Sequence, residues 1–310
     1  MADGTSKASS GSTHDSRAPF GRVLTAMVTP FRADGSLDVS QAQALADHLV
    51  NLGNDGLVVS GTTGESPTTT DTEKDRLLRA VLDAVGDRAT VIAGVGTFDT
   101  RHTVEGARAA EKAGAHGVLV VTPYYNKPPQ SGLRAHFTAV ADATDLPMMI
   151  YDIPGRTGTP VATETLIALA EHERIVAVKD AKGDIHATTQ VLAATDLAYY
   201  SGIDELNLAL LAVGAVGVVS VVGHVAAGRY AELVRAVDAG DLVAARAIDR
   251  ALLPAVRGLM TYTQGAIMAK AALQLAGVLP TRTMRPPLPD ATDDEVARLR
   301  ADLDEAGLLG

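Results

Sequence analysis

Residues 175–201 read IVAVKDAKGDIHATTQVLAATDLAYYS and contain a complete strand–helix–strand pattern. Residues 175–179 and 198–201 are short, mostly apolar runs typical of strands, and residues 185–194 carry apolar side chains at a spacing of about 3.6, as in a helix. Strands that are apolar on both faces and joined by a helix are typical of a parallel sheet covered on both sides. The stretch therefore predicts one unit of an α/β fold.

The same alternation repeats along most of the chain. The other strand-like runs are residues 23–29, 56–60, 90–93, 117–122, 148–151 and 216–221, which makes eight strands in total. The other helix-like segments between them are residues 40–52, 72–85, 100–113, 131–143, 162–171 and 205–213. Because closing eight apolar strands into a ring removes exposed sheet edges, we expect a (β/α)8 TIM barrel, with a doubly wound open sheet as the alternative.

We divide the chain into three segments. Residues 1–18 are polar, rich in Ser and Gly and without the apolar stretch of a signal peptide, which predicts a disordered tail. Residues 19–240 hold the barrel. Residues 241–310 form a C-terminal helical extension, with helices expected at 242–257, at 266–275 and from Asp293 onwards. The uncharged stretch 206–228 is long enough to span a membrane, but its glycines and polar residues favour a buried helix, turn and strand.

Composition excludes several classes of function. The net charge of −10 and the lack of clustered Lys and Arg argue against binding of nucleic acids. The sequence has no Cys, which removes disulfides, thiol nucleophiles and cysteine-based zinc sites and fits a cytosolic protein. The remaining candidates for chemistry are residues at the carboxyl ends of the strands, where the active sites of such barrels lie.

Lys179 directly follows the apolar run 175–178 and, among these residues, gives the strongest indication of the chemistry. A lysine removed from water has a lowered pKa and therefore a usable neutral amine. Such an amine can attack a ketone, and the resulting iminium ion acidifies the neighbouring carbon. The alternative is a strand-end lysine that forms an ion pair with Asp180 or another carboxylate.

Two further strand ends carry groups that suit an acidic substrate. Residues 61–66, Gly-Thr-Thr-Gly-Glu-Ser, offer hydroxyl and backbone N–H groups that can hold a carboxylate, although a plain glycine-rich turn is the alternative. Tyr151 ends another strand and could transfer protons, and Arg156 on the following Pro/Gly loop could bind a second carboxylate. A core tyrosine and a surface arginine are the alternatives for these two residues.

Taken together, segments 61–66, 122–126, 151–158, 178–181, 201–202 and 217–221 resemble the 4-hydroxy-tetrahydrodipicolinate synthase family, also called the dihydrodipicolinate synthase family. The likeness runs from about residue 20 to the C-terminus, keeps the family's order and spacing, and is greatest to actinobacterial members. It implies a lyase of lysine and diaminopimelate biosynthesis that works without a metal or organic cofactor. Such an enzyme condenses pyruvate with L-aspartate 4-semialdehyde to give 4-hydroxy-tetrahydrodipicolinate.

The resemblance also assigns roles to individual residues. Lys179 matches the lysine that forms a covalent Schiff base with pyruvate. Thr62 and Thr63 match the pair that receives the pyruvate carboxylate, and Thr63 also belongs to a proton relay. Tyr151 matches the central acid/base of that relay, and Tyr125 matches a tyrosine that reaches in from a neighbouring subunit.

The remaining matches concern the second substrate and the assembly. Arg156 matches the arginine that recognises the carboxylate of the semialdehyde, and Gly202 and Val219 match backbone positions that line the pocket. A relay shared between subunits implies a homo-oligomer, which in this family is a cytoplasmic tetramer built as a dimer of dimers. No membrane or nucleic-acid partner is implied.

The sequence departs from the family pattern at two places. Ile203 stands where many members have Asp after Ser-Gly. The positions that bind inhibitory lysine in feedback-sensitive members, His, His, Asn and Glu, are here Asp71, Lys74, Phe98 and His102. We therefore predict weak or absent feedback inhibition by lysine.

Two alternatives remain open at this point. The first is another Schiff-base enzyme of the same superfamily, such as an N-acetylneuraminate or 2-keto-3-deoxy sugar acid lyase. The pair Thr62-Thr63 and the cation of Arg156 favour the synthase over these lyases. The second alternative is a barrel that binds a 2-oxo acid without catalysis, since a fold does not dictate a function.

Overall fold

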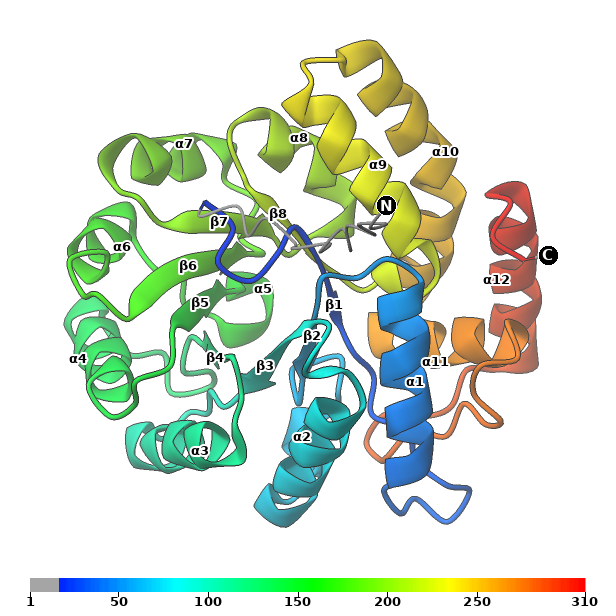
Figure 1. The fold of residues 1–310 in the computed structure, drawn as a ribbon, viewed down its shortest axis with the longest axis horizontal. Helices are drawn as coiled ribbons and strands as arrows, with labels where there is room; N and C mark the ends of the chain where they lie inside the picture. Colours follow the sequence, from blue (N-terminus) through cyan, green and yellow to red (C-terminus); the bar gives the residue numbers. More distant parts are fainter. Residues whose placement is uncertain (1–16, 310) are drawn as a thin grey trace, which may run out of the picture.

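The computed structural model describes residues 17–309 and contains a closed barrel of eight parallel strands in the order β1 to β8. Figure 1 looks along the barrel, with the strands at the centre and the helices around them. The predicted TIM barrel is confirmed, and the open sheet is excluded because β1 pairs with β8. The strands are β1 Val23–Ala26, β2 Gly56–Val59, β3 Thr90–Gly94, β4 Gly117–Val121, β5 Met148–Asp152, β6 Ile175–Asp180, β7 Ala198–Ser201 and β8 Gly217–Ser220.

The helices between the strands lie close to the predicted ranges. Helix α2 begins sharply because Thr70 and Glu73 form a reciprocal capping box. The helices up to β8 are α1 Val39–Asn51, α2 Asp71–Val85, α3 Thr100–Ala113, α4 Gln130–Ala141, α5 Pro154–Thr157, α6 Thr163–Leu169, α7 Ile185–Ala194 and α8 Asn207–Ala212. Two short 3-10 helices, Ser66–Thr68 and Asp204–Leu206, lie in loops after strands.

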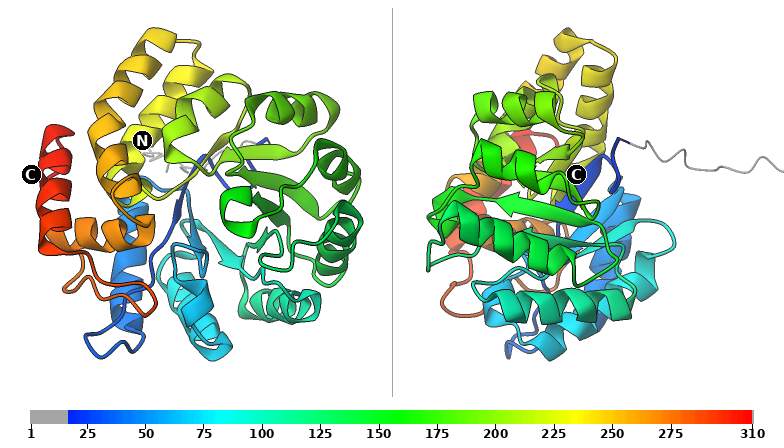
Figure 2. Two further views of the ribbon diagram at one scale, coloured as in Figure 1. Left: turned by 180° about the vertical axis from the view of Figure 1, so that it is seen from behind. Right: turned by 90° about the vertical axis from the view of Figure 1, so that its left-hand side faces the viewer.

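Beyond β8 the chain is helical. Helix α9 (Gly223–Asp238) completes the ring, and α10 (Leu242–Met260), α11 (Gly265–Leu275) and α12 (Asp293–Glu305) follow it. Figures 1 and 2 show α10, α11 and α12 together on the side of the barrel where α1 and α9 lie. The proposed tail falls mostly outside the described residues, and its last residue, Ala18, is buried. Within residues 17–309, no helix is long and apolar enough to cross a membrane.

The core has two layers, which follow from the alternation of side chains along each strand. Outward residues such as Ile150 and Val178 pack under the helices, and inward residues such as Met149 and Ala177 fill the barrel. Two residues further along, the same alternation turns Tyr151 and Lys179 inward at the carboxyl ends of β5 and β6. The barrel therefore delivers both groups to the face where we expected the site.

Candidate active site

Lys179 lies inside the mouth of the barrel, in contact with Tyr151. The two residues are register partners on β5 and β6, and the Lys179 Nζ is 4.2 Å from the centre of the Tyr151 ring. Lys179 is only 5% exposed. Gly202 leaves room for its stem, because a Cβ at position 202 would lie 2.9 Å from both Cγ and Cε of Lys179.

Burial shifts the pKa of the Lys179 amine. Its pKa falls to about 8, because loss of contact with water and the charge of Arg156 lower it more than the charge of Asp204 raises it. Asp180 serves another purpose, since its carboxylate accepts hydrogen bonds from the backbone of Lys182 and Gly183 and from the Thr188 hydroxyl. These contacts hold the loop after β6. The Lys179 amine is thus sheltered, and the adjacent carboxylate is engaged elsewhere.

The loop at residues 61–66 turns back sharply after β2. Its backbone closes through hydrogen bonds from the N–H of Glu65 to the carbonyl of Thr62 (3.1 Å) and from the N–H of Ser66 to the carbonyl of Gly61 (3.2 Å). Glu65 has φ +55°, in the left-handed region. Thr63 is buried and Thr62 is half-buried, so the loop presents two hydroxyl-bearing residues at the strand end.

Tyr151 and Arg156 are brought together by the turn after β5. Burial raises the pKa of the Tyr151 hydroxyl to about 12, while the charge of Arg156 and a hydrogen bond with Thr62 lower it. Helix α5 starts at Pro154 and consists of a single turn, which keeps Arg156 close to the strand end. The Arg156 side chain is exposed, as expected for a cation that meets a substrate from solvent.

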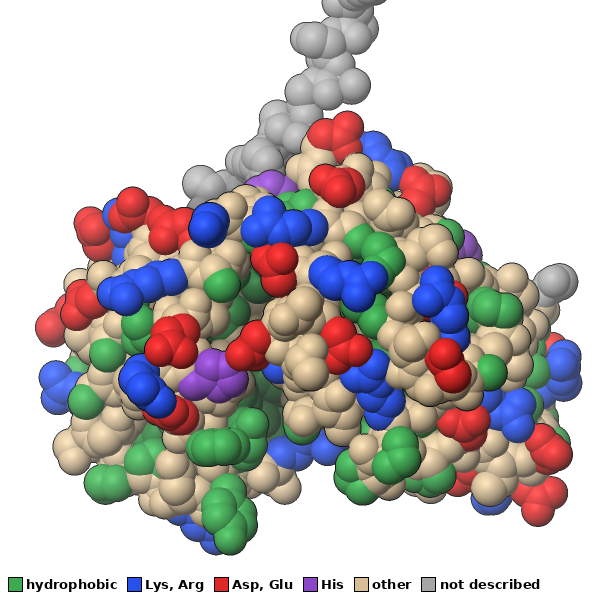
Figure 3. Space-filling view, turned by 90° about the horizontal axis from the view of Figure 1, so that it is seen from below, with side chains coloured by type: hydrophobic (Ala, Val, Ile, Leu, Met, Phe, Trp, Pro, Cys, Tyr) green, Lys and Arg blue, Asp and Glu red, His purple; other side chains and the backbone are tan. Residues whose placement is uncertain are grey.

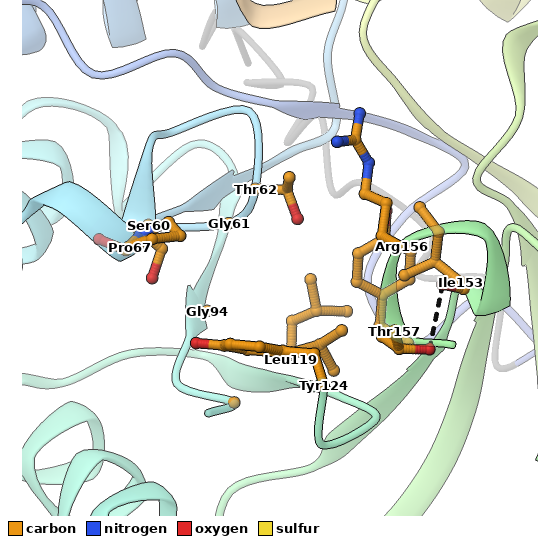
Figure 4. A pocket seen from close by; sticks show the side chains of 14 residues that line it. Ser60, Gly61, Thr62, Pro67, Gly94, Leu119, Tyr124, Ile153, Arg156 and Thr157 are labelled. Atoms are coloured by element: carbon orange, nitrogen blue, oxygen red, sulfur yellow. Dashed lines mark hydrogen bonds between the residues drawn. The ribbon is translucent and has the colours of Figure 1, made fainter. Parts of the chain in front are cut away.

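A cavity of about 200 Å³ opens between Thr62, Tyr151 and Arg156, while Lys179 and Thr63 do not line it. Figure 4 shows Thr62 on one side of it, Arg156, Ile153 and Thr157 on another, and Leu119 and Tyr124 along the base. Tyr151 also lines the cavity, and most of the remaining wall is apolar or glycine. A small cavity with a few convergent polar groups is typical of a small-molecule site.

The other predicted residues lie around this cavity or away from it. Lys179 packs against Gly202 and the Tyr151 ring, and Val219 belongs to the apolar cluster inside the barrel. Tyr125 lies outside the cavity, with φ +73° and a side chain that is 92% exposed. Within one chain, therefore, Tyr125 does not join the site.

Asp204 is a residue that the sequence did not single out. Its buried carboxylate accepts hydrogen bonds from the backbone of Val221 (2.8 Å) and Val222 (3.1 Å) and from the Ser220 hydroxyl (2.5 Å). It ties the loop after β7 to the loop after β8 and supplies the nearby negative charge that acts on Lys179. Asp204 could have been proposed from the sequence because it closely follows Ser201 and Gly202 at the end of a strand. Only Ile203 was considered at this place.

Charged side chains of both signs are spread over the surface that Figure 3 draws, and no basic patch gathers there. Among residues 17–309, no group of three or more His, Asp or Glu side chains could hold a metal ion. The chemistry that the described site offers is that of an amine, two hydroxyl groups, a phenol and a guanidinium.

Comparison with known proteins agrees with this geometry. Residues 19–306 match the model of the dihydrodipicolinate synthetase family. The 4-hydroxy-tetrahydrodipicolinate synthases of Kineococcus radiotolerans and Acidothermus cellulolyticus are 70% and 68% identical, each over 94% of both chains. The crystal structure of the lysine-bound enzyme from Cyanidioschyzon merolae has 44% identity and a TM-score of 0.91, covering 94% of this chain and 99% of that one. The chain therefore belongs to the dihydrodipicolinate synthetase family.

Proposed function

We propose that this enzyme condenses pyruvate with L-aspartate 4-semialdehyde to form 4-hydroxy-tetrahydrodipicolinate, through a Schiff base on Lys179. The observation that carries the proposal is the buried Lys179 amine, with its lowered pKa, in contact with Tyr151 at the carboxyl end of β6. A solvated lysine would remain protonated at neutral pH and would not attack a ketone.

The first half of the reaction activates pyruvate. The Lys179 amine attacks the keto carbon, and loss of water leaves an iminium ion on the lysine nitrogen. The iminium ion withdraws electrons from the methyl group, which loses a proton and becomes an enamine. Thr62 and Thr63 receive the pyruvate carboxylate, while Thr63, Tyr151 and a partner subunit's tyrosine at position 125 carry protons.

The second half joins the two substrates. The enamine carbon bonds to the aldehyde carbon of the semialdehyde, whose oxygen takes up a proton. The amino group of the semialdehyde then attacks the iminium carbon, which closes the ring and returns Lys179 as a free amine. Arg156, exposed at the rim, binds the semialdehyde carboxylate, and the backbones of Gly202 and Val219 line the pocket.

Assay of the purified chain with both substrates tests the proposal. We expect product in the presence of pyruvate and L-aspartate 4-semialdehyde, and none from Lys179→Arg, whose guanidinium stays protonated. Cleavage of N-acetylneuraminate or of a 2-keto-3-deoxy sugar acid without condensation would identify an N-acetylneuraminate or sugar acid lyase instead of the synthase. Binding of pyruvate without turnover of any of these compounds would support the non-catalytic sensor.

We further propose a cytoplasmic homo-oligomer, a tetramer built as a dimer of dimers, that needs no metal or organic cofactor. The exposed Tyr125 and Phe98, 92% and 56% exposed, support an interface near the site. Sedimentation of the wild type should give a tetramer. A fully active monomer would contradict the shared relay.

A further inference from the structure

The loop at residues 61–66 is fastened to the C-terminal extension through Glu65. The Glu65 carboxylate accepts a hydrogen bond from the Lys270 Nζ of α11 at 2.5 Å and another from the backbone N–H of Arg285 at 2.9 Å. The side chains of Glu65 and Lys270 are each only 1% exposed. Two charges are thus buried together, and one of them, Glu65, lies two residues after Thr63 in the chain.

The surrounding contacts fix this ion pair in place. Lys270 also donates to the carbonyl of Thr283 at 2.7 Å and lies 4.2 Å from the centre of the Phe31 ring. The guanidinium of Arg285 contacts the same ring and donates to Glu73 of α2 at 2.6 Å. The cluster therefore joins α11 and the segment after it to α2 and to the loop after β1.

The backbone of the loop needs such support. Glu65 has φ +55°, a conformation that costs free energy for a residue with a side chain and persists only where its surroundings hold it. The preceding residue, Gly64, is held from the other side, because its carbonyl accepts a hydrogen bond from the Thr29 hydroxyl at 2.6 Å. Thr62 and Thr63 thus lie in a turn whose end is fixed by the loop after β1 and by α11.

Charge gives Lys270 a second effect on the same loop. An unpaired carboxylate at position 65 would repel a substrate carboxylate bound at Thr62 and Thr63. The Lys270 ammonium cancels this charge inside the protein, where water screens it poorly.

We propose that Glu65 and Lys270 are positioning residues, whose buried ion pair holds Thr62 and Thr63 in the conformation that receives the pyruvate carboxylate. The C-terminal extension thereby sets the affinity for pyruvate, although none of its residues lines the cavity described above. The inference rests on the proposed function, in which Thr62 and Thr63 bind that carboxylate.

The test measures pyruvate capture by the full chain. Pyruvate is titrated, the Schiff base is reduced with borohydride, and the mass added at Lys179 is quantified. We expect Glu65→Gln to raise the half-saturating pyruvate concentration by about tenfold or more, with wild-type labelling at saturation, because one amide oxygen replaces two carboxylate acceptors. A pure charge effect predicts the opposite, since an unpaired Lys270 would attract pyruvate. An unchanged or lowered half-saturating concentration would overturn the proposal.

Two further variants sharpen the result. Lys270→Met should also raise the half-saturating pyruvate concentration. If Lys270→Met does not fold, the result for Glu65→Gln still decides the question. Asp302→Asn is the matched control, because Asp302 is a buried carboxylate of the extension that pairs with Arg257 and accepts from Tyr262 at 2.6 Å. Asp302→Asn should have the half-saturating pyruvate concentration of the wild type. If that concentration rises as much as in Glu65→Gln, general loss of stability explains the effect and the positioning role is rejected.

The outcomes also separate this inference from the function on which it rests. Absence of label at Lys179 in the wild type would reject the proposed Schiff base. Normal labelling of the wild type with an unaltered Glu65→Gln would reject only the positioning role.

Discussion

At the scale of single residues, the position of Lys179 along β6 determines that its side chain enters the barrel. Two residues earlier Ala177 faces the inside of the barrel, so the pleat turns Lys179 inward as well, and Asp180 outward. The same alternation places Tyr151 next to it on β5. An amine, a phenol and their dry surroundings thus follow from strand geometry and register.

The lowered pKa of Lys179 predicts the pH dependence of pyruvate capture. Attack requires the neutral amine, whose fraction grows as pH rises toward the pKa of about 8. At low, fixed pyruvate, the rate of Schiff-base formation should rise about tenfold per pH unit below this pKa and level off above it. Stopped-flow measurement between pH 6 and 9.5 checks this, and a rate that still rises at pH 9.5 would contradict it.

Removal of a nearby positive charge should move this profile. Arg156 lowers the pKa of Lys179, so Arg156→Met should raise that pKa and shift the midpoint of the profile to higher pH. The wild type in the same buffers is the reference. A shift to lower pH would mean that the two cations do not interact as the structure indicates.

Substitution of Gly202 should impair Schiff-base formation, because Lys179 packs directly against this glycine. In Gly202→Ala the new methyl group would lie 2.9 Å from Cγ and Cε of Lys179, which must then move. We expect Schiff-base formation to slow by about tenfold or more with little loss of thermal stability. Gly228→Ala, where the nearest atom lies at an ordinary 3.4 Å, is the control and should react normally. Normal capture by Gly202→Ala would contradict the tight packing.

The sequence predicts Lys179, Tyr151, Thr62 and Arg156 as site residues, because each ends or closely follows a short apolar strand. It did not predict Asp204, because this carboxylate binds backbone N–H groups of the loop between β8 and α9 that only the closed barrel brings near. Its role depends on three-dimensional contacts across separate loops, which a single sequence does not encode as a pattern.

At the scale of elements, most strand and helix limits could be predicted from apolar periodicity, and the exceptions have local causes. The first strand was expected to reach residue 29, but β1 ends at Ala26. Beyond it, Met27 still donates to the carbonyl of Val58 on β2. Val28 then donates to the His224 ring of α9 and the Thr29 hydroxyl to the carbonyl of Gly64, so the strand ladder does not continue. Helix α5 was not predicted, because a helix of four residues has no periodicity to detect.

His224 joins the end of β1 to α9 and should make stability depend on pH. Its Nε2 accepts from the backbone of Val28 at 3.1 Å and its Nδ1 lies 2.7 Å from the carbonyl of Val221, which requires a neutral ring with the proton on Nδ1. Burial lowers the pKa of His224 from 6.5 to about 4. Between these values the unfolded chain binds a proton that the folded chain does not, so stability is fully present above pH 6.5 and is lost as pH falls.

The contribution of His224 amounts to roughly 3 kcal/mol across this window. His224→Asn should therefore flatten the fall in melting temperature between pH 7 and 5, although burial also lowers the pKa of His136 to about 4 and keeps part of the slope. His186→Asn, at an exposed position of α7, is the control and should keep the wild-type slope. An equally steep fall in His224→Asn would contradict this account.

At the scale of the whole molecule, the closed barrel could be predicted from the number and spacing of the strands, but the docking of the C-terminal extension could not. Lys270 and Glu65 are separated by 205 residues, and nothing in either local sequence indicates that they pair. The helices of the extension were predictable from their periodicity. Their contact with the loop at residues 61–66 arises only in the assembled fold.

A second cavity, of about 260 Å³, lies between α2 and α3. It contains three of the four positions on which the prediction of weak or absent lysine inhibition is based. Asp71, Lys74 and His102 line it, and Asp71 already contacts the His102 ring at 2.9 Å and the Lys74 ammonium at 3.7 Å. A ligand ammonium would have to compete with these basic groups. We therefore expect millimolar L-lysine to inhibit the condensation weakly or not at all.

The control restores the residues of feedback-sensitive relatives at the four positions. The combined variant Asp71→His, Lys74→His, Phe98→Asn and His102→Glu should gain sensitivity to lysine in the same assay. Strong inhibition of the wild type by lysine would show that the basic groups in this cavity do not exclude it.

The central claim is that the amine inside the barrel mouth bonds covalently to a keto acid. The most direct test incubates the whole chain with pyruvate, reduces it with borohydride and determines the mass of its peptides. We predict one reduced pyruvate per chain on the peptide that contains Lys179, and none on Lys179→Arg. An unmodified Lys179 at saturating pyruvate, or label on another lysine, would contradict the mechanism.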